Sequence, residues 1–223
     1  MSPVLYAYPK QAQFGRVIAK SKIYEHAAAG KTLKNLFIQQ VEHIIWQYKL
    51  APETVNLPGK PEAPEIQVID MHLKMGVLHN EVLASIDKAI PFPLIFQLHW
   101  QRQIRVSAAW KRPNAADSSK WVIGDYLSSG WLAEESPRQP LPLALDLRSL
   151  YEQIIRQLLP LTPRAGETLP EQLERWREIG RKQHEHRQFQ IKLHKEKQFN
   201  RKVELNSQIR RIEQELQQLS NAS

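Results

Sequence analysis

Apolar and polar positions follow the clearest pattern in the middle of the chain, over residues 65–111. β-branched and long apolar residues predict a strand over 66–73, and a stripe at spacings of three and four predicts a helix over 77–88. Further strands are predicted over 94–101 and 104–110, joined by a tight turn at Arg102-Gln103. A strand, a helix and a strand in this order favour a right-handed parallel crossover, and the last strand should add to it as a hairpin.

The segments around this centre predict further elements of the same domain. One wide apolar stripe predicts a helix over 31–50, with Pro52 after its end. A second stripe predicts a helix over 143–159, and a short strand broken by Gly124 is expected near 121–127. We therefore expect an α/β (α+β) single domain with a mixed sheet over residues 1–161. The stripe of the first helix consists of Leu33, Leu36, Phe37, Val41, Ile44, Ile45 and Tyr48.

The C-terminal part of the chain has a different pattern, that of one long basic helical segment. After a linker at 162–170, a helical pattern runs from Glu171 to Leu219 with no proline, and it predicts a basic helical arm over 171–223. An unbroken helix of this length would be a rod of roughly 70 Å, too long to lie wholly on the domain, so part of it should project or contact a partner. Its last turns follow the four-three spacing of a coiled coil, and upstream apolar positions such as Leu193 are out of that register, as at a stutter. The seam residues, which we expect to bind a partner or a second copy, are Leu205, Ile209, Ile212, Leu216 and Leu219.

Composition adds a charge bias. The 223-residue chain carries a formal net charge of +8. It has no cysteine, and this absence excludes disulfides and thiolate zinc sites.

No apolar run approaches the ~20 residues that span a bilayer. The N-terminus lacks the charged, apolar and small-residue regions of a signal peptide, so we expect a cytoplasmic protein. A basic run in the arm favours phosphate contact without base reading; a solvated helix face and an acidic protein partner are the alternatives. The run consists of Arg181, Lys182, Arg187, Lys192, Lys195, Lys197, Arg201 and Lys202.

Candidate chemistry is sparse. Glu42, Glu65, Asp70 and Lys74 suggest a metal-dependent nuclease, because carboxylates beside a lysine can bind magnesium next to a phosphodiester. The acid–x–lysine triplet of restriction nucleases is absent, however, and Asp70 and Lys74 share one strand face with His72. There is no glycine-rich phosphate loop. We predict no catalytic residues, no metal site and no cofactor.

Four segments carry a resemblance to a known family. They are KTLKNLFIQQVEHIIWQYKLAPETVNL (31–57), EIQVIDMHLK (65–74), LASIDKAIPFPLIFQL (83–98) and KEKQFNRKVELNSQIRRIEQELQQL (195–219). In order and spacing they resemble an uncharacterised bacterial and archaeal family, domain of unknown function 4391. The resemblance implies a role beside helicases or DNA methyltransferases of restriction or phage-defence type. We therefore expect a non-enzymatic accessory subunit of such a complex, with the nuclease as the alternative.

Overall fold

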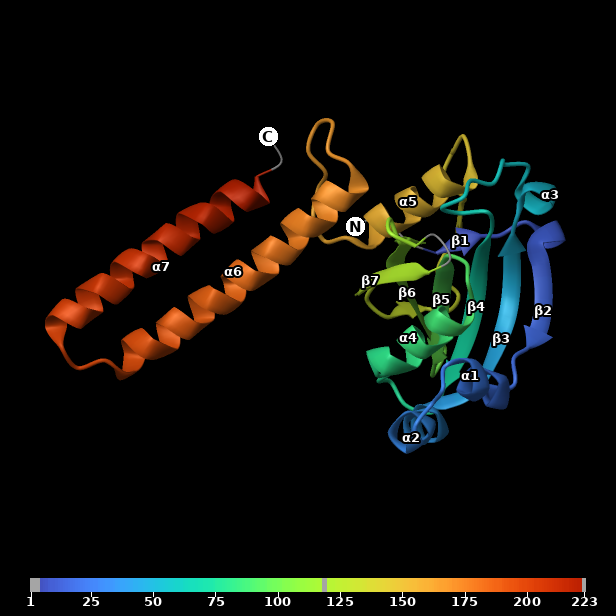
Figure 1. Ribbon diagram of the computed structural model, residues 1–223, viewed down its shortest axis with the longest axis horizontal. Helices are drawn as coiled ribbons and strands as arrows, with labels where there is room; N and C mark the ends of the chain where they lie inside the picture. Colours follow the sequence, from blue (N-terminus) through green and yellow to red (C-terminus); the bar gives the residue numbers. More distant parts are fainter. Residues whose placement is uncertain (1–4, 118–119, 222–223) are drawn as a thin grey trace. The chain divides into compact units, whose positions relative to one another are not determined.

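The computed structural model describes residues 5–117 and 120–221 (Figure 1). The chain divides into two compact units, one that ends at Leu158 and one that begins at Leu159. No helix among the described residues combines the length and the apolar character needed to cross a membrane.

The first unit is built on a mixed β-sheet, as the sequence predicts. Within the described residues the sheet has seven strands, six of them in the order β2-β3-β4-β5-β6-β7, with β8 (Leu132–Ala133) paired to β6. β4 and β5 are parallel and are joined by a helix, whereas the other neighbours are antiparallel. The six strands are β2 (Gln13–Val17), β3 (Val41–Leu50), β4 (Ile66–Leu73), β5 (Leu94–Trp100), β6 (Gln103–Pro113) and β7 (Trp121–Ser128).

Helices cover both faces of this sheet. On one face α1 (Lys20–His26), α2 (Lys31–Gln40) and α4 (Asn80–Ala89) enclose a core that includes Ile69, Met71 and Phe96 from β4 and β5. Against the other face lies α5 (Leu147–Leu158), whose Tyr151 ring stacks on Trp110 of β6 at 5.3 Å. The central strands β4 and β5 are buried along most of their length, which suits their apolar sequences. The remaining short elements are β1 (Tyr6–Ala7), which pairs with β9 (Gln139–Pro140), η1 (Lys10–Ala12) and α3 (Pro52–Val55).

The predicted helix over 31–50 is wrong in its second half. The helix ends at Gln40, and residues 41–50 form β3, which pairs with both β2 and β4. The pairing of β3 with β4 shifts register between Val41 and His43 and again between Trp46 and Tyr48. Such bulges interrupt the two-residue alternation of a strand, so the buried positions Val41 and Ile44 fall at a spacing of three and imitate a helix.

Two smaller predictions also need correction. The turn between β5 and β6 consists of Gln101 and Arg102, one residue earlier than predicted, and both residues have positive φ angles of 46° and 59°. Positive φ at both central residues is the geometry that matches the twist of a two-residue hairpin. The strand near 121 is continuous through Gly124 instead of broken there.

The second unit is a helical hairpin and not a single rod. α6 (Leu169–Lys195) is about 40 Å long, and α7 (Phe199–Ser220) returns alongside it (Figure 1). Residues 196–198 leave the helical conformation without a proline or glycine. The Glu196 carboxylate accepts hydrogen bonds from the backbone N–H groups of Lys197 and Gln198, which stabilises the turn and lowers the pKa of Glu196. The predicted helical arm is thus present as two helices, and the chain turns at the stutter between Leu193 and Phe199.

Candidate functional site

The hairpin begins with a strong helix-start signal. Thr168 and Glu171 form a reciprocal capping box at the N-terminus of α6, with Pro170 in the first turn. Seven residues further on, Arg175 closes the base of the hairpin. Its guanidinium contacts both carboxylate oxygens of Glu167, at 2.6 and 2.7 Å, and donates to the Leu219 carbonyl at 2.9 Å. These hydrogen bonds lower the pKa of Glu167 to about 2.

The predicted seam lies mostly inside this hairpin. Leu205, Ile209 and Ile212 are buried, and Leu216 and Leu219 are half-buried. Charged pairs connect the two helices beside the seam, for example Lys182 with Glu215 and His186 with Glu213. The five residues predicted to bind a partner therefore pack within the second unit.

Seven of the eight predicted basic residues fall into two groups. Arg181 and Lys182 lie in the half of the hairpin near its base. Arg181 forms an ion pair with Glu174, and Lys182 forms ion pairs with Glu185 and Glu215. Arg187 is exposed between the two groups. The other five lie around the turn, and we call them the cationic tip: Lys192, Lys195, Lys197, Arg201 and Lys202.

The cationic tip is poorly neutralised. All five side chains are exposed, and among the described residues only Arg201 forms an ion pair, with Glu204 at 2.7 Å. Lys192 lies 5.2 Å from the centroid of the Phe189 ring. The acid of the turn itself, Glu196, is engaged with backbone N–H groups. The structure thus concentrates positive charge at the turn of the hairpin, and four of the five cations have no ion pair within the described residues.

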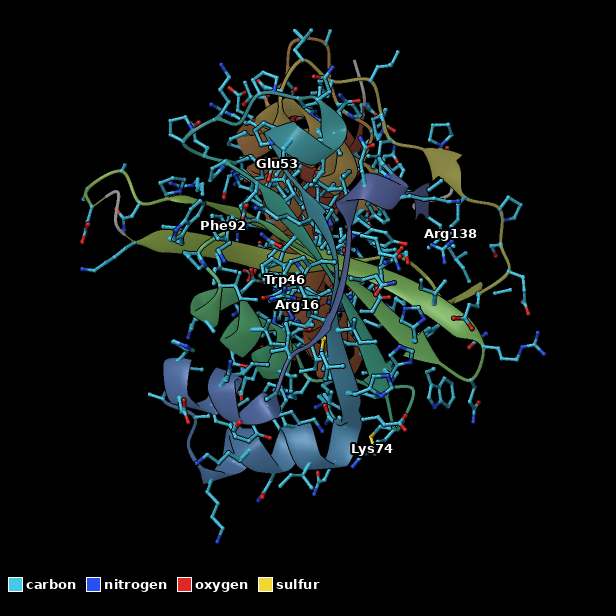
Figure 2. All side chains as sticks on the ribbon, turned by 90° about the vertical axis from the view of Figure 1, so that its right-hand side faces the viewer. Arg16, Trp46, Glu53, Lys74, Phe92 and Arg138 are labelled. Carbon is cyan, nitrogen blue, oxygen red and sulfur yellow. The ribbon has the colours of Figure 1, made fainter. Side chains whose placement is uncertain are left out.

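A polar pocket of about 370 Å³ lies in the first unit, on the sheet face that α5 partly covers. Asp70 of β4 is aligned with Gln97 of β5, and the Gln97 amide donates to the Asp70 carboxylate at 2.8 Å. His99 of β5 lies between two carboxylates, with Nε2 3.6 Å from Asp70 and Nδ1 3.3 Å from Glu134. Arg138, which precedes β9, donates to the Gln97 side chain (Figure 2).

Three histidine rings cross the sheet beside this pocket. His43, His72 and His99 stack in succession across β3, β4 and β5, with centroid separations of 4.1 and 4.7 Å. Burial lowers the pKa of His72, and the two neighbouring imidazoles lower it further. Burial also disfavours charge on His99, but the carboxylates of Asp70 and Glu134 outweigh it, so the pKa of His99 is raised. His99, which lines the pocket and has a raised pKa, therefore lies beside His72, whose pKa is lowered.

The proposed nuclease residues are not brought together. Asp70 contacts Gln97 and His99, whereas Glu65 forms an ion pair with Lys49 at 3.0 Å before β4 begins. Lys74 lies beyond the other end of β4 and donates to the Ile38 carbonyl, and Glu42 is exposed on β3. Nine residues of extended chain separate Glu65 from Lys74, about 30 Å. Figure 2 shows Lys74 and Glu53, which also contacts Lys49, at opposite ends of the sheet.

No metal centre is found in the part of the chain that the structure describes, where no three His, Asp or Glu side chains are placed to share an ion. A signal for part of the polar pocket was present but did not lead to a prediction: Asp70 lies on one strand, and the alternating Gln97 and His99 lie on another. No such signal existed for Arg138, which enters the pocket from an irregular segment.

Comparison with known proteins gives one match. A family model described as "Domain of unknown function (DUF4391)" matches residues 7–216. No curated protein and no solved structure matches the chain.

Proposed function

Since the chain belongs to the DUF4391 family, whose description names no activity, we propose a function from the geometry of the hairpin. The protein acts as a non-enzymatic accessory subunit that binds the phosphate backbone of a nucleic acid through the cationic tip. The observation that carries this proposal is the exposed charge of the turn, where Arg201 alone of the five cations forms an ion pair among the described residues. Five cations face one carboxylate between residues 192 and 202, and that carboxylate is engaged in capping the turn.

Physical chemistry favours a phosphate partner for such a surface. Clustered lysine and arginine side chains displace counterions from a nucleic acid, and this release supplies most of the free energy of binding that does not depend on sequence. Lysine acts there as a point charge with no directional requirement, so contacts of this kind position a protein without reading bases. Lys195 and Lys197 are next to or on the turn at residues 196–198, and the other three lie within about one helical turn of it, where a groove or strand can approach from outside.

The proposal includes a protein partner of the DNA-processing type. The family resemblance suggests a helicase or a DNA methyltransferase from a restriction or phage-defence system. In that arrangement the first unit docks on the enzyme, and the hairpin contacts the nucleic acid that the enzyme handles. Exposed apolar side chains near the turn, Phe199 and Val203, add a surface that either partner can cover.

Charge reversal of the cationic tip tests the proposal. We expect wild type to bind a labelled DNA duplex of about 30 base pairs with a log–log salt slope near −4 to −5, as five phosphate contacts predict. Glutamate at positions 192, 195, 197, 201 and 202 should abolish this binding in fluorescence anisotropy. Five exposed residues of the first unit provide a matched control when they are reversed in the same way: Lys10, Lys31, Lys34, Lys88 and Arg112.

Comparison of the two variants distinguishes the effect of where the charges lie from the effect of the protein's net charge. Each reversal removes two positive units, so five of them lower the formal net charge from +8 to −2 in either variant. If both variants lose binding equally, net charge and not the tip is responsible. If wild type shows no salt-dependent binding to DNA or RNA, the proposal fails.

A further inference from the structure

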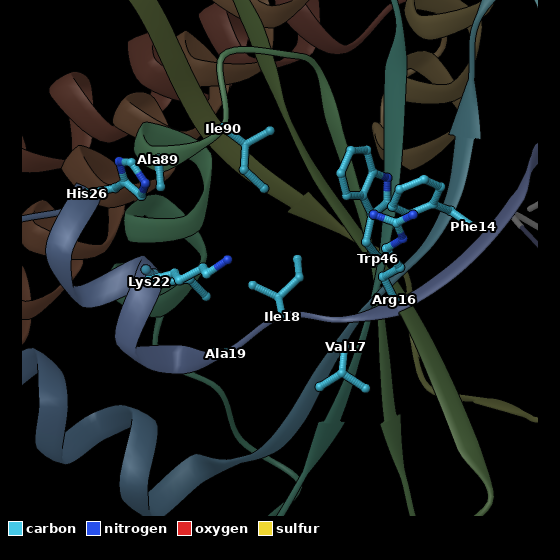
Figure 3. A pocket seen from close by; sticks show the side chains of 11 residues that line it. Phe14, Arg16, Val17, Ile18, Ala19, Lys22, His26, Trp46, Ala89 and Ile90 are labelled. Atoms are coloured by element: carbon cyan, nitrogen blue, oxygen red, sulfur yellow. The ribbon is translucent and has the colours of Figure 1, made fainter.

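A second pocket, of about 420 Å³, lies at the edge of the sheet in the first unit (Figure 3). We call it the edge pocket. Phe14 and Trp46 form one wall from β2 and β3, Ile23 comes from α1, and Ile90 follows α4. Its volume lies in the range of small-molecule sites, ~300–1,000 Å³. The residues that line it include none from the hairpin, so a ligand of the edge pocket is independent of the proposed function.

The wall of the edge pocket is apolar and aromatic. The rings of Phe14 and Trp46 lie 4.3 Å apart at a tilt of 45°. The indole N–H of Trp46 is buried and has no hydrogen-bond partner among the described residues. A buried donor without an acceptor costs free energy, and this cost belongs to the fold. The pocket itself offers apolar contact area on an aromatic wall.

The charged groups of the edge pocket all have one sign. Arg16 and Lys22 line it beside the imidazole of His26, and no carboxylate of the described residues does. The Arg16 guanidinium lies 4.5 Å from the centroid of the Phe14 ring, which holds it beside the aromatic wall (Figure 3). A basic lining beside an apolar wall complements a molecule that carries a negative group on an apolar body.

We propose that the edge pocket binds a small organic anion, a carboxylate or sulfonate carried on an aromatic or branched apolar body. The body packs against Phe14, Trp46 and Ile90, and the anionic group lies between Arg16 and Lys22. Charge-assisted hydrogen bonds to a guanidinium and an ammonium are stronger than neutral ones, so the anionic group should dominate selectivity.

Two probes that share one body test this assignment. 8-Anilinonaphthalene-1-sulfonate carries the anionic group, and N-phenyl-1-naphthylamine is the same body without it. We expect the full-length protein to bind the sulfonate at one saturable site, about tenfold or more tighter than the neutral probe, a difference of about 1.4 kcal/mol. Binding is followed by probe fluorescence and by calorimetry.

Substitutions assign the binding to the edge pocket. Arg16→Gln with Lys22→Gln should remove most of the preference for the sulfonate while the neutral probe still binds. Lys10→Gln with Lys31→Gln removes the same charge from exposed positions outside the pocket and should change neither affinity. Ala89→Leu places a larger side chain in the pocket and should weaken both probes, with circular dichroism to show that the fold is retained.

Three results would overturn the proposal. One is a sulfonate affinity no higher than that of the neutral probe. Another is an equal loss of preference in the two double variants, which would assign the effect to overall charge. The third is unchanged binding in a folded Ala89→Leu variant, which would place the probe elsewhere.

Discussion

Replacing Arg175 by methionine should open the base of the hairpin. The side chains of Arg175 and Glu167 are only 5% and 9% exposed, and they form a bidentate pair. The same guanidinium donates to the carbonyls of Thr162 and Leu219, so one side chain connects the start of the hairpin with the end of α7. Methionine has a similar volume and none of these donors.

The magnitude follows from the pKa of Glu167. A shift from its ordinary 4.5 to about 2 corresponds to about 3 kcal/mol of stabilisation of the charged form in the folded state. Removing one member of a buried pair typically costs 3–5 kcal/mol. The Glu167 carboxylate keeps the hydrogen bond from the Arg164 backbone N–H, which places the expected loss at the lower end of this range. We therefore expect the Arg175→Met variant to lose about 3 kcal/mol of hairpin stability, roughly a hundredfold increase in the population of the open hairpin.

Hydrogen exchange measured peptide by peptide reports on this opening within the full-length protein. Amides of α6 and α7 should exchange faster in Arg175→Met, while those of β4 and β5 should not change. Arg211→Met is the matched control, since Arg211 is 82% exposed and its ion pair within the described residues is with the half-buried Glu215. Surface pairs of this kind contribute ~0–1 kcal/mol. Similar exchange in the two variants would refute the assigned role of the buried pair.

The pH dependence has a definite sign. Because the folded-state pKa of Glu167 is depressed, its contribution is fully present above about 4.5 and is lost as the pH falls toward about 2. The helical signal of wild type should therefore weaken over this window. In Arg175→Met the same window should show a smaller change, after correction for the other carboxylates that both proteins share. A wild-type signal independent of pH between 4.5 and 2 would contradict the linkage.

Three further predictions concern single groups. Lys111→Met should cost about 3–5 kcal/mol in denaturant unfolding, because it leaves the buried carboxylate of Asp87 without its cation, and adding Asp87→Asn should recover part of the loss. Thr168→Ala should cost about 1 kcal/mol through the lost cap, seen as faster exchange in the first turn of α6 alone. By NMR, His99 should titrate above its ordinary pKa of 6.5, and Asp70→Asn should lower that midpoint; an unchanged midpoint would exclude Asp70 as a cause.

The raised pKa of His99 also predicts a direction for stability. A group whose folded-state pKa is raised stabilises the fold fully below its ordinary pKa, and this contribution is lost as the pH rises through the folded value. Burial works against the charged form, and the carboxylates of Asp70 and Glu134 are the groups that raise the pKa of His99. The contribution of His99 should therefore be greatest on the acidic side of neutrality.

The sequence predicts the centre of the fold well because each signal there is local. The strand, helix and strand over 66–101 combine β-branched runs, one apolar stripe and two prolines, and all of these agree with the observed elements. The prediction for residues 41–50 fails because the features that make them a strand, β3, depend on a partner strand far away in the sequence. Bulges that arise from pairing with β4 displace the buried positions, and only the partner strand reveals the displacement. The abundance of β-branched and aromatic residues in 41–50 is the signal that should have outweighed the apparent stripe.

The candidate sites show the same contrast: features made by neighbouring residues can be predicted from the sequence, and features made by distant residues cannot. A basic run is visible in any sequence, and its exposed part is found where the pattern places it. The neutralisation of Arg181 and Lys182 depends on carboxylates, Glu174 and Glu215, of which one lies on the returning helix. The polar and edge pockets each gather side chains from at least three segments, so no spacing rule along the chain could have assembled them.

The hairpin changes what a protein partner can use. Leu205, Ile209 and Ile212 are already buried, and exposing each would cost about 1.5–3 kcal/mol. A partner helix that pairs with this seam must first displace α6, so it has to offset several kcal/mol before it gains affinity. Substitution of these three residues would destabilise the hairpin, and a loss of partner binding in such a variant would not identify a contact. Phe199 and Val203 are exposed by 77% and 53%, so alanine at these positions should leave the hairpin folded, and any loss of binding there would report a direct contact.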